Sequence, residues 1–202
     1  MDLNLVTALS HVKMAMMGAA EKSAKRRLAV YSNTITCKKG CDGCCSRMVH
    51  ITIAEAVVIQ EHVQKTGKWS EVRARAITMA TVVKVANPVS WFKMNFKCPI
   101  LDPAAKTCLA YEVRPAPCSV HFVTSDPNLC DPWSTSGGGY QPVEMEDVYE
   151  ESSRKIESKV DGHGILAFKL PLPVALLLAE RIKHRKGLSS QEVMSFIFNE
   201  LK

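Results

Sequence analysis

Residues 37–45 read Cys37-Lys-Lys-Gly-Cys41-Asp-Gly-Cys44-Cys45, so four cysteines fall within nine residues. A packed core has no use for cysteine at this density, whereas thiolate sulfur is a preferred ligand of zinc, copper(I) and iron–sulfur clusters. Four more cysteines follow, and none lies outside residues 37–130. The sequence therefore predicts that all eight are metal ligands: Cys37, Cys41, Cys44, Cys45, Cys98, Cys108, Cys118 and Cys130.

The spacing inside the run is informative. Cys41 and Cys44 form a C-x2-C pair, which brings two sulfurs to one ion through a tight turn, and Cys37 adds a third ligand. The two glycines of the run allow such a turn. Cys45 directly follows Cys44, and neighbouring side chains usually point in different directions. The double cysteine could therefore serve two sites, two irons of one cluster, or one ligand and one packing contact.

The spacing of the later cysteines bears on the metal. Structural zinc often uses two C-x2-C pairs, but the last four cysteines lie ten to twelve residues apart, without a second pair. A [4Fe–4S] cluster takes thiolates from more scattered positions, often with proline beside a ligand, as in Cys98-Pro99 and Pro117-Cys118. We therefore expect an iron–sulfur cluster of the [4Fe–4S] type as the cofactor, with Zn²⁺ as the alternative.

A disulfide framework is the rival interpretation, since disulfides belong to small secreted domains. The start, Met1-Asp2-Leu3-Asn4, has no basic leader before an apolar run, so we expect no signal peptide. A chain of 202 residues can also bury a sizeable core. The most apolar stretch, residues 165–179, is interrupted by a lysine and two prolines and is shorter than the ~20 residues of a membrane helix. The sequence favours a soluble, cytoplasmic metal protein that does not enter membranes.

Charge is uneven along the chain. The net charge is +6, and residues 1–40 carry seven Lys or Arg against two acids, a local excess of +5. Such a basic helix can follow nucleic-acid phosphates through counterion release, although a solvated helix face is the commoner use. We therefore keep nucleic acid, or a protein complex, as a candidate partner of the N-terminal helix. Lys38 and Lys39 are expected to lower the pKa of the thiols beside them.

Helical signals flank the cysteine region. Apolar residues at helical spacing predict a helix over 3–30, with Leu5, Ala8, Leu9, Val12, Met16 and Ala19 on its buried face. Thr52 and Glu55 have the spacing of a capping box, and Gly67 is placed as a C-terminal stop. Further helices are predicted over residues 70–86, 143–160, 173–187 and 189–202.

The stretch from Val89 to Tyr140 is rich in proline and ends near a run of three glycines, so long regular elements are improbable in it. An irregular stretch of this length usually needs an organiser, and bound metal could supply it. The expected fold is mainly α, with helices around an irregular, proline-rich, metal-organised segment. We expect an N-terminal basic helical extension (1–36), a cysteine-cluster metal-binding domain (37–135) and a C-terminal helical region packed on the same core (136–202).

The combined pattern resembles the YkgJ-type cysteine-cluster family, the CxxCxxCC zinc- or iron-chelating domain. The resemblance covers residues 37–122 and consists of Cys37-x3-Cys41-x2-Cys44-Cys45, Cys98-Pro99-Ile100-Leu101 and Cys108-x2-Tyr111-x2-Arg114-Pro115-x2-Cys118. The family commonly has a basic residue where this chain has Ser119, and Cys130 lies beyond the matched part. The resemblance implies metal chelation. The flagellin lysine N-methylases are similar to this domain and are associated with an iron–sulfur cluster, but the core motif alone does not transfer methylation.

Three residues near the second half of the motif have expected roles. The Arg114 guanidinium should bond backbone carbonyls or offset thiolate charge. Tyr111 is expected to be a core aromatic with a bonded hydroxyl. His121, three residues after Cys118, is a candidate ligand or a donor to a ligating sulfur, with an ordinary histidine as the alternative.

The expected function is binding of a cysteine-ligated metal centre, with no molecular role assigned. The sequence has no G-x-G-x-x-G, P-loop or G-x-S-x-G motif, so nucleotide binding and serine hydrolase chemistry are unsupported. Three alternatives remain: a structural zinc protein, an enzyme related to the flagellin lysine N-methylases, and a nucleic-acid or assembly adaptor.

Overall fold

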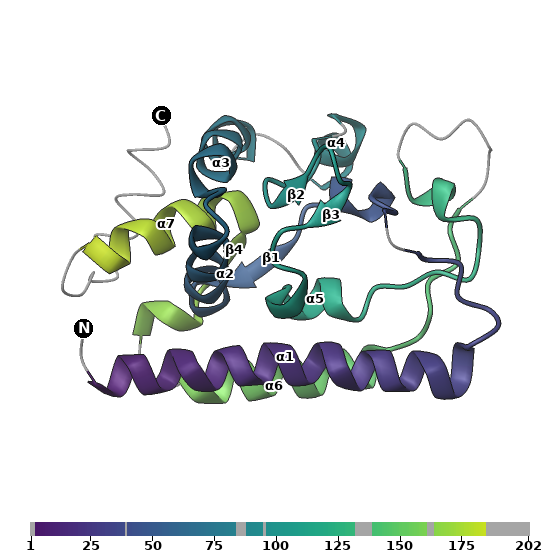
Figure 1. Ribbon diagram of the computed structural model, residues 1–202, viewed down its shortest axis with the longest axis horizontal. Helices are drawn as coiled ribbons and strands as arrows, with labels where there is room; N and C mark the ends of the chain where they lie inside the picture. The colour runs from purple at the N-terminus through teal and green to yellow at the C-terminus, as the bar shows by residue number, and fades with distance from the viewer. Residues whose placement is uncertain are drawn as a thin grey trace.

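The computed structural model describes residues 3–38, 40–83, 88–94, 96–131, 139–160 and 164–184. The fold is mainly α-helical, as predicted (Figure 1). The α-helices are α1 (Leu3–Tyr31), α2 (Ile53–Lys65), α3 (Trp69–Val83), α4 (Pro88–Met94), α5 (Ala116–Ser119), α6 (Glu146–Val160) and α7 (Leu172–His184). The strands are β1 (His50–Thr52), β2 (Leu101–Asp102), β3 (Thr107–Cys108) and β4 (Lys169–Pro171). The 3₁₀ turns are η1 (Gly43–Ser46), η2 (Tyr111–Val113), η3 (Pro127–Cys130) and η4 (Gly164–Ala167).

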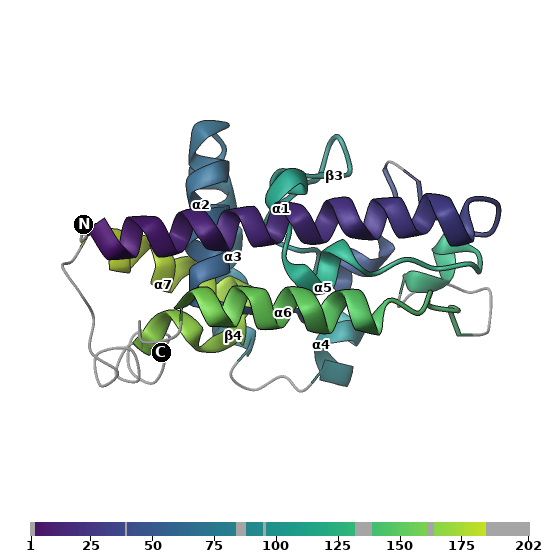
Figure 2. The same ribbon diagram turned by 90° about the horizontal axis from the view of Figure 1, so that it is seen from below.

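The two helices α1 and α6 run side by side along one side of the molecule (Figure 2). The predicted inner face of α1 is confirmed, because Ala8, Leu9, Val12, Met16 and Ala19 are all buried. The side chain of Leu5 lies outside the described residues. Apolar side chains at this spacing form one stripe along the helix, and that stripe faces the rest of the protein.

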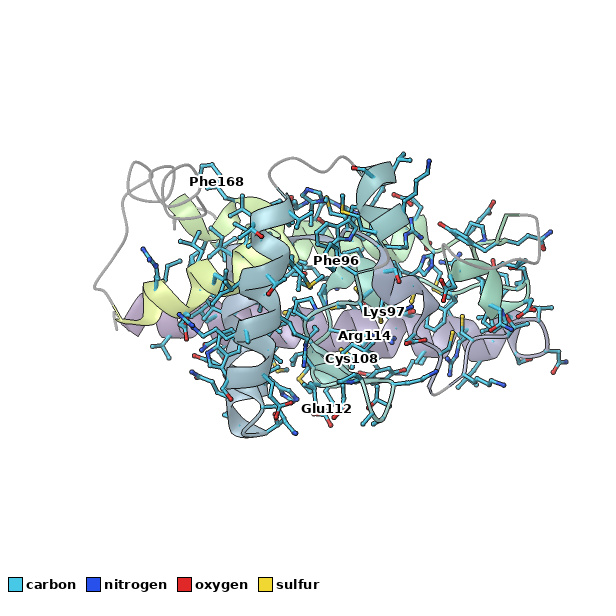
Figure 3. All side chains as sticks on the ribbon, turned by 90° about the horizontal axis from the view of Figure 1, so that it is seen from above. Phe96, Lys97, Cys108, Glu112, Arg114 and Phe168 are labelled. Atoms are coloured by element: carbon cyan, nitrogen blue, oxygen red, sulfur yellow. The ribbon has the colours of Figure 1, made fainter. Side chains whose placement is uncertain are left out.

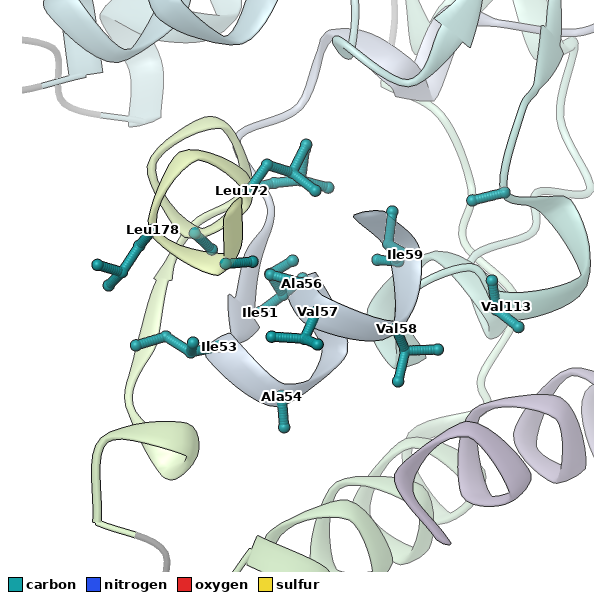
Figure 4. Close-up of a cluster of buried hydrophobic side chains, with 14 of the residues drawn as sticks. Ile51, Ile53, Ala54, Ala56, Val57, Val58, Ile59, Val113, Leu172 and Leu178 are labelled. Atoms are coloured by element: carbon teal, nitrogen blue, oxygen red, sulfur yellow. The ribbon is translucent and has the colours of Figure 1, made fainter. Parts of the chain in front are cut away.

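Helix α2 is the centre of the main hydrophobic cluster, part of which Figure 4 shows. The predicted capping box opens this helix: the Glu55 N–H donates to Thr52 Oγ1 (3.1 Å), and the Thr52 N–H donates to Glu55 Oε2 (2.8 Å). Gly67 follows the end of α2 with φ +73°, a left-handed conformation that suits glycine. Every residue from Ile53 to Gln60 is buried, because α1, α3 and α7 all pack against this helix.

A short sheet near the start of α2 was not predicted. Strand β1 pairs antiparallel with β4, with Ile51 opposite Leu170. Because the strands are antiparallel, the first residues of α2 and α7 lie at opposite ends of this two-stranded ribbon: the Ile53 N–H donates to the Phe168 carbonyl (3.0 Å) at one end, and the Leu172 N–H donates to the Val49 carbonyl (2.8 Å) at the other. Strands of three residues carry too little alternation for recognition from the sequence, and their pairing spans more than a hundred residues.

The middle of the chain has only short elements in the part that the structure describes. Between Lys97 and Asp131 no strand, 3₁₀ turn or helix is longer than four residues. Helix α4, which has seven residues, lies within the stretch expected to be irregular and was not predicted. That metal organises this segment stays a prediction.

The later helices agree with the predicted ones to within a few residues. Helix α3 covers the prediction for residues 70–86 as far as Val83, and α6 begins three residues later than expected. Helix α7 begins at Leu172, next to the predicted start. The helix predicted over 189–202 lies outside the described residues. Among the residues that the structure describes, no helix has the length and apolar character that a membrane span requires.

The main hydrophobic cluster draws on α1, α2, α3, α6 and α7 together. A smaller second cluster consists of Phe122, Val143, Met145 and Val148, with Tyr31, Ile35, Cys37 and Val120 packed against it. The C-terminal helices α6 and α7 therefore share a core with the N-terminal half. The division of the chain into three segments stays a prediction.

Candidate metal centre

The cysteine run is folded into tight turns. Gly40 has φ +85°, and the Cys41 N–H donates to the Lys38 carbonyl (3.1 Å). Directly after this turn, η1 carries both Cys44 and Cys45, and the Cys45 N–H donates to the Asp42 carbonyl (3.0 Å). These local backbone bonds fold the run into successive turns without help from distant residues.

Gly43 lets the fourth of the later cysteines approach the run. A Cβ atom added at Gly43 would lie 2.9 Å from Cβ of Cys130 and 3.2 Å from the backbone N of Asp131. Real Cβ atoms do not come this close, so only glycine fits here. The reason for this glycine is therefore a close approach between η1 and η3, in addition to the turn expected from the sequence.

Backbone hydrogen bonds connect the segment of Cys98 to the run and the segment of Cys108 to that of Cys98. The Cys98 N–H donates to the Cys45 carbonyl (2.8 Å), and the Leu101 N–H donates to the Cys98 carbonyl (3.0 Å). Strand β2 then pairs with β3 so that Leu101 lies opposite Cys108. A short hairpin thus returns Cys108 toward the cysteine that opens it.

Cys118 is positioned by α5, which a buried carboxylate connects to α2. The Ala116 N–H donates to Glu55 Oε1 (3.1 Å), while the other oxygen of Glu55 accepts from Thr52. The Cys118 N–H donates to the Pro115 carbonyl (2.9 Å). Glu55 therefore caps two helices at once, since each helix start leaves backbone N–H groups without an intrahelical partner.

Cys37 accepts a hydrogen bond on its sulfur. The Val123 N–H donates to Cys37 Sγ (3.3 Å), and the Thr36 N–H donates back to the Val123 carbonyl (3.1 Å). Hydrogen bonds to sulfur are one way in which proteins adjust the properties of metal–thiolate centres. The segment after Cys118 is thus bound to the segment that enters the run.

All eight cysteines are free thiols, so the disulfide framework finds no support. Burial is the main reason why the thiols of this region are hard to ionise. It raises the pKa of Cys98 to about 12 and that of Cys130 to about 11, with neighbouring thiolates adding to both. The pKa of Cys108 and Cys118 is raised for the same reason. A metal must therefore displace protons to bind here.

Cys44 is the exception. Its pKa falls to about 7, because Cys45 donates a hydrogen bond to its sulfur and the cations of Arg47 and Arg114 lie nearby. The pKa of Cys45 is raised by the same bond and by burial. The expectation that the pKa of Cys37 is lowered is wrong: this pKa is raised, chiefly by burial. Lys39 lies outside the described residues.

Arg114 has both of its predicted roles. Its Nη2 donates to the Ser119 carbonyl (3.3 Å), and its charge lowers the pKa of Cys44 and Cys108 against the effect of burial (Figure 3). The guanidinium also stacks over the Tyr111 ring at 4.4 Å from the centroid. The prediction that Tyr111 is a core aromatic is wrong, since it is 57% exposed and covers this arginine instead.

His121 contacts an arginine. Arg47 Nη1 lies 3.3 Å from both ring nitrogens of His121, and the ring of Tyr140 meets the imidazole edge-on at 5.7 Å. Burial, and then the charge of Arg47, lower the pKa of His121 to about 4, so the ring is neutral at ordinary pH. A ligand role for His121 therefore gains no support from its contacts.

Two further residues near the site escaped the sequence reasoning. Arg75 of α3 donates to the Pro99 carbonyl through Nε (3.0 Å) and Nη2 (2.7 Å), and so holds the backbone beside Cys98. Arg47 follows the cysteine run and was not singled out. Neither has a local signal, because an arginine on a helix or after a turn is common, and only the fold brings it to the thiols.

The cysteine sulfurs are the kind of ligand that soft metals prefer. In this structure, however, they do not surround one point. Within the described ranges, which include every cysteine, no three His, Cys, Asp or Glu side chains form a group able to hold an ion as they stand. Ligation would require the thiols to lose protons and rotate toward the metal. Free thiols, an N–H donor to sulfur and nearby arginines are what a thiolate centre needs to balance its charge. That all eight cysteines are ligands stays a prediction.

The comparisons with known proteins point to the same region. The family described as "CxxCxxCC: Putative zinc- or iron-chelating domain" matches residues 36–135. This match extends past the resemblance seen in the motif and includes Cys130. No curated protein and no solved structure matches the chain. Over residues 36–135, the chain carries a domain of the CxxCxxCC family of cysteine-rich metal-chelating domains.

Proposed function

We propose that this protein binds an iron–sulfur cluster, of the [4Fe–4S] type, through its cysteines. One observation carries the proposal: all eight cysteines are free thiols, and the segments that bear Cys98 and Cys130 meet the cysteine run. Membership of the family supports chelation of zinc or iron by these residues. When bound, such a cluster can transfer single electrons or simply cross-link the polypeptide.

The protein's own groups suit an anionic thiolate centre. Four thiolates on one centre leave a net negative charge, which Arg47 and Arg114 partly offset. The N–H of Val123 stabilises the Cys37 sulfur, and buried apolar side chains of the second cluster limit access of water on that side. Such surroundings favour a metal centre that stays bound in the folded protein over one that binds only transiently.

The test is anaerobic purification of the full chain, followed by iron, zinc and acid-labile sulfide analysis and a visible absorption spectrum. A brown protein that contains iron and equimolar sulfide supports the proposal. A colourless protein with stoichiometric zinc would replace the cluster with the second candidate. A protein without either metal, after anaerobic isolation from metal-supplemented medium, contradicts both.

Structural zinc is the second candidate because of the turn at the run. The C-x2-C pair Cys41–Cys44 lies on a tight turn with Gly43 inside it, an arrangement that zinc sites use often. Zinc held by four thiolates would serve as a cross-link, without redox chemistry.

An enzymatic role finds no support in the groove that the structure shows. This open groove lies along α6 and beside β4, and no cysteine lines it. Its lining residues are Tyr149, Glu150, Ser153, Arg154, Glu157 and Lys169. A methylase-like reaction would need a cofactor pocket next to the metal, and this groove is not one.

The adaptor alternative is weakened by ion pairs along α1. Lys22 and Arg26 contact Glu151 and Asp147 of α6, and Lys25 contacts an acid on its own helix. Cations that already face carboxylates offer less free charge to phosphates. Binding of nucleic acid with a steep salt dependence, lost when Lys25, Arg26 and Arg27 are neutralised, would still support this role.

A further inference from the structure

Helix α1 has a second apolar stripe, on its outer side. Val6, Met14, Met17 and Leu28 are between 41% and 66% exposed, and together with Val30 they give α1 more exposed large hydrophobic side chains than any other described element. Val6, Met17 and Leu28 follow one another at intervals of eleven residues, which is about three helical turns, so they lie in one line along the helix. Met14 lies beside this line, one turn before Met17. We name Val6, Met14, Met17 and Leu28 the outer stripe.

The outer stripe is separate from the face that α1 buries. The buried residues Val12 and Ala19 lie about 140–160° round the helix from Met17. Helix α6 contacts α1 on the side that carries Lys22 and Arg26, and Figure 2 shows the two helices side by side. The rest of the protein therefore leaves the outer stripe open to solvent. An exposed apolar line of this length marks an interaction surface.

The residues along this side of α1 are arranged symmetrically about Met17. Val6 and Leu28, which are both large, stand eleven residues before and after it, and Ser10 and Ala24, which are both small, stand seven residues before and after it. An antiparallel pair of identical helices with its two-fold axis at Met17 therefore brings Val6 opposite the partner's Leu28. The small residues face each other between these contacts and let the two backbones come close. A two-fold interface demands such self-complementarity, because the same surface serves both copies.

The charges beside the stripe match the same pairing. Lys13 and Glu21, which are both exposed, stand four residues before and after Met17. Antiparallel pairing places Lys13 opposite the partner's Glu21, twice by symmetry, whereas a parallel pair would set like charges against each other. Glu21 also pairs with Lys25 of its own helix through Oε1 (2.7 Å), and a carboxylate with two oxygens can accept from both cations. The occupant that this surface fits is therefore another copy of itself.

We propose that two copies of this chain associate through α1, antiparallel, with the outer stripe of each copy against that of the other and Met17 at the two-fold axis. The contact runs from Val6 to Leu28, a length of about 33 Å. One pair of helices is a small interface, so we expect a weak dimer that forms in the micromolar range of protein concentration. The pairing uses no cysteine and goes beyond the proposed function. A nucleic acid or an anionic membrane fits this surface less well, because it would meet the carboxylate of Glu21 near the middle of the stripe.

Sedimentation velocity of the anaerobically purified full chain, over a series of concentrations, tests the dimer and its location. Met17→Glu places two carboxylates together at the two-fold axis and should weaken dimerisation by a factor of about ten or more. Val30→Glu is the matched control, because Val30 is 63% exposed on the same helix but lies about 140° round it from Met17. The control should dimerise like the wild type.

Exchange of charges tests the antiparallel register. Lys13→Glu and Glu21→Lys each set like charges opposite each other and should each weaken dimerisation about tenfold. The double variant K13E/E21K restores both ion pairs with their signs exchanged, so dimerisation should recover. Lys65→Glu controls for net charge, because it makes the same change of charge as Lys13→Glu at an exposed position near the end of α2.

A wild type that forms dimers with rising concentration, while M17E stays monomeric and V30E does not, supports the proposal. A wild type that remains monomeric up to several hundred micromolar overturns it, and so does a monomer that binds vesicles of anionic lipid or nucleic acid through α1 instead. Equal dimerisation of M17E and V30E overturns the location, and a K13E/E21K variant no stronger than the single variants overturns the register.

Circular dichroism shows whether each variant folds, and metal analysis shows whether its cysteine region is unchanged. If M17E does not fold, Leu28→Ser takes its place, because Leu28 is 66% exposed and its loss leaves the buried face of α1 intact. Weaker dimerisation of L28S supports the proposal, and dimerisation equal to that of V30E overturns it. Metal content should be the same in all of these variants, so a failure of the dimer leaves the proposed function untouched, and the reverse holds as well.

Discussion

Helix α2 and the cysteine-bearing stretch from Lys97 to Asp131 meet at Glu55, yet they are stabilised in different ways. Helix α2 is enclosed by three other helices, and its residues from Ile53 to Gln60 are all buried. The cysteine stretch has no element longer than four residues and is joined to its surroundings by single hydrogen bonds, close approaches and a few buried side chains such as Ile100 and Val113. The helix is stabilised by apolar packing along most of its length, whereas for the stretch we expect bound metal to add cross-links.

Removal of the metal should have the largest effect and should affect the two regions differently, because structural metal centres contribute on the order of 10 kcal/mol to folding. Anaerobic treatment with a strong chelator should abolish hydrogen-exchange protection between Lys97 and Asp131 while the amides of α2 and α7 stay protected. Amide exchange read by mass spectrometry measures both regions in one sample. Equal loss of protection in α2 would show that the two regions are not separately stabilised.

A cavity in the helical region should have the next largest effect. Ile59→Ala removes a fully buried side chain of α2 and should lower the free energy of unfolding by about 2–5 kcal/mol, with metal content unchanged. Ile77→Ala on α3 is the matched control, because Ile77 is 42% exposed. Chemical denaturation of both variants gives the two values, and similar losses would contradict the assigned burial.

Gly43→Ala tests the close approach on the cysteine side. The added Cβ would lie 2.9 Å from Cβ of Cys130, so η1 and η3 must separate, at a cost of about 1–3 kcal/mol. Metal content should fall as well. Gly18→Ala on α1 is the control, since nothing lies within 4 Å of its added Cβ, and it should stabilise the helix by about 0.5–1 kcal/mol. Thermal unfolding with metal analysis decides the case, and an unaffected G43A protein would refute the contact.

Glu55→Gln should have the smallest effect and a characteristic pH dependence. Burial raises the pKa of Glu55, despite its bonds from Thr52 and Ala116. A carboxyl with a raised folded pKa contributes full stability below its unfolded pKa and loses it as pH rises through the folded pKa. Raising the pH from 4 to 7 should therefore lower the free energy of unfolding of the wild type, relative to that of E55Q, by about 1 kcal/mol. Parallel denaturation curves at both pH values measure it, and a constant difference would exclude ionisation of Glu55.

Local signals predicted the scaffold well. The capping box at Thr52 and Glu55, the stop at Gly67 and the buried stripe of α1 follow from spacing over a few residues, and all are present. The β1–β4 ribbon escaped prediction, because its three-residue strands lie far apart in the chain. For the same reason the second use of Glu55, as a cap for α5, had no signal near it.

The ligand chemistry of the site could be predicted from the sequence better than the residues that surround the cysteines. The density of cysteine identified the residues and the class of ligand, and the family match agrees on chelation. The arginines at positions 47 and 75 were missed, and Tyr111 was placed inside although it lies outside. Burial and charge compensation depend on which distant segments meet, and no single stretch of sequence contains that information.

The amino-acid sequence alone determined that this chain is mainly helical, that its helices begin and end where capping residues stand, and that cysteine sulfur is its characteristic chemistry. These properties depend on side-chain type and on spacing within a few turns. Tertiary structure decided that Arg47 and Arg114 lie near Cys44, and that Gly43 must be small for Cys130 to approach. Those properties arise only when segments up to ninety residues apart pack together, because distances between them are set by the whole fold.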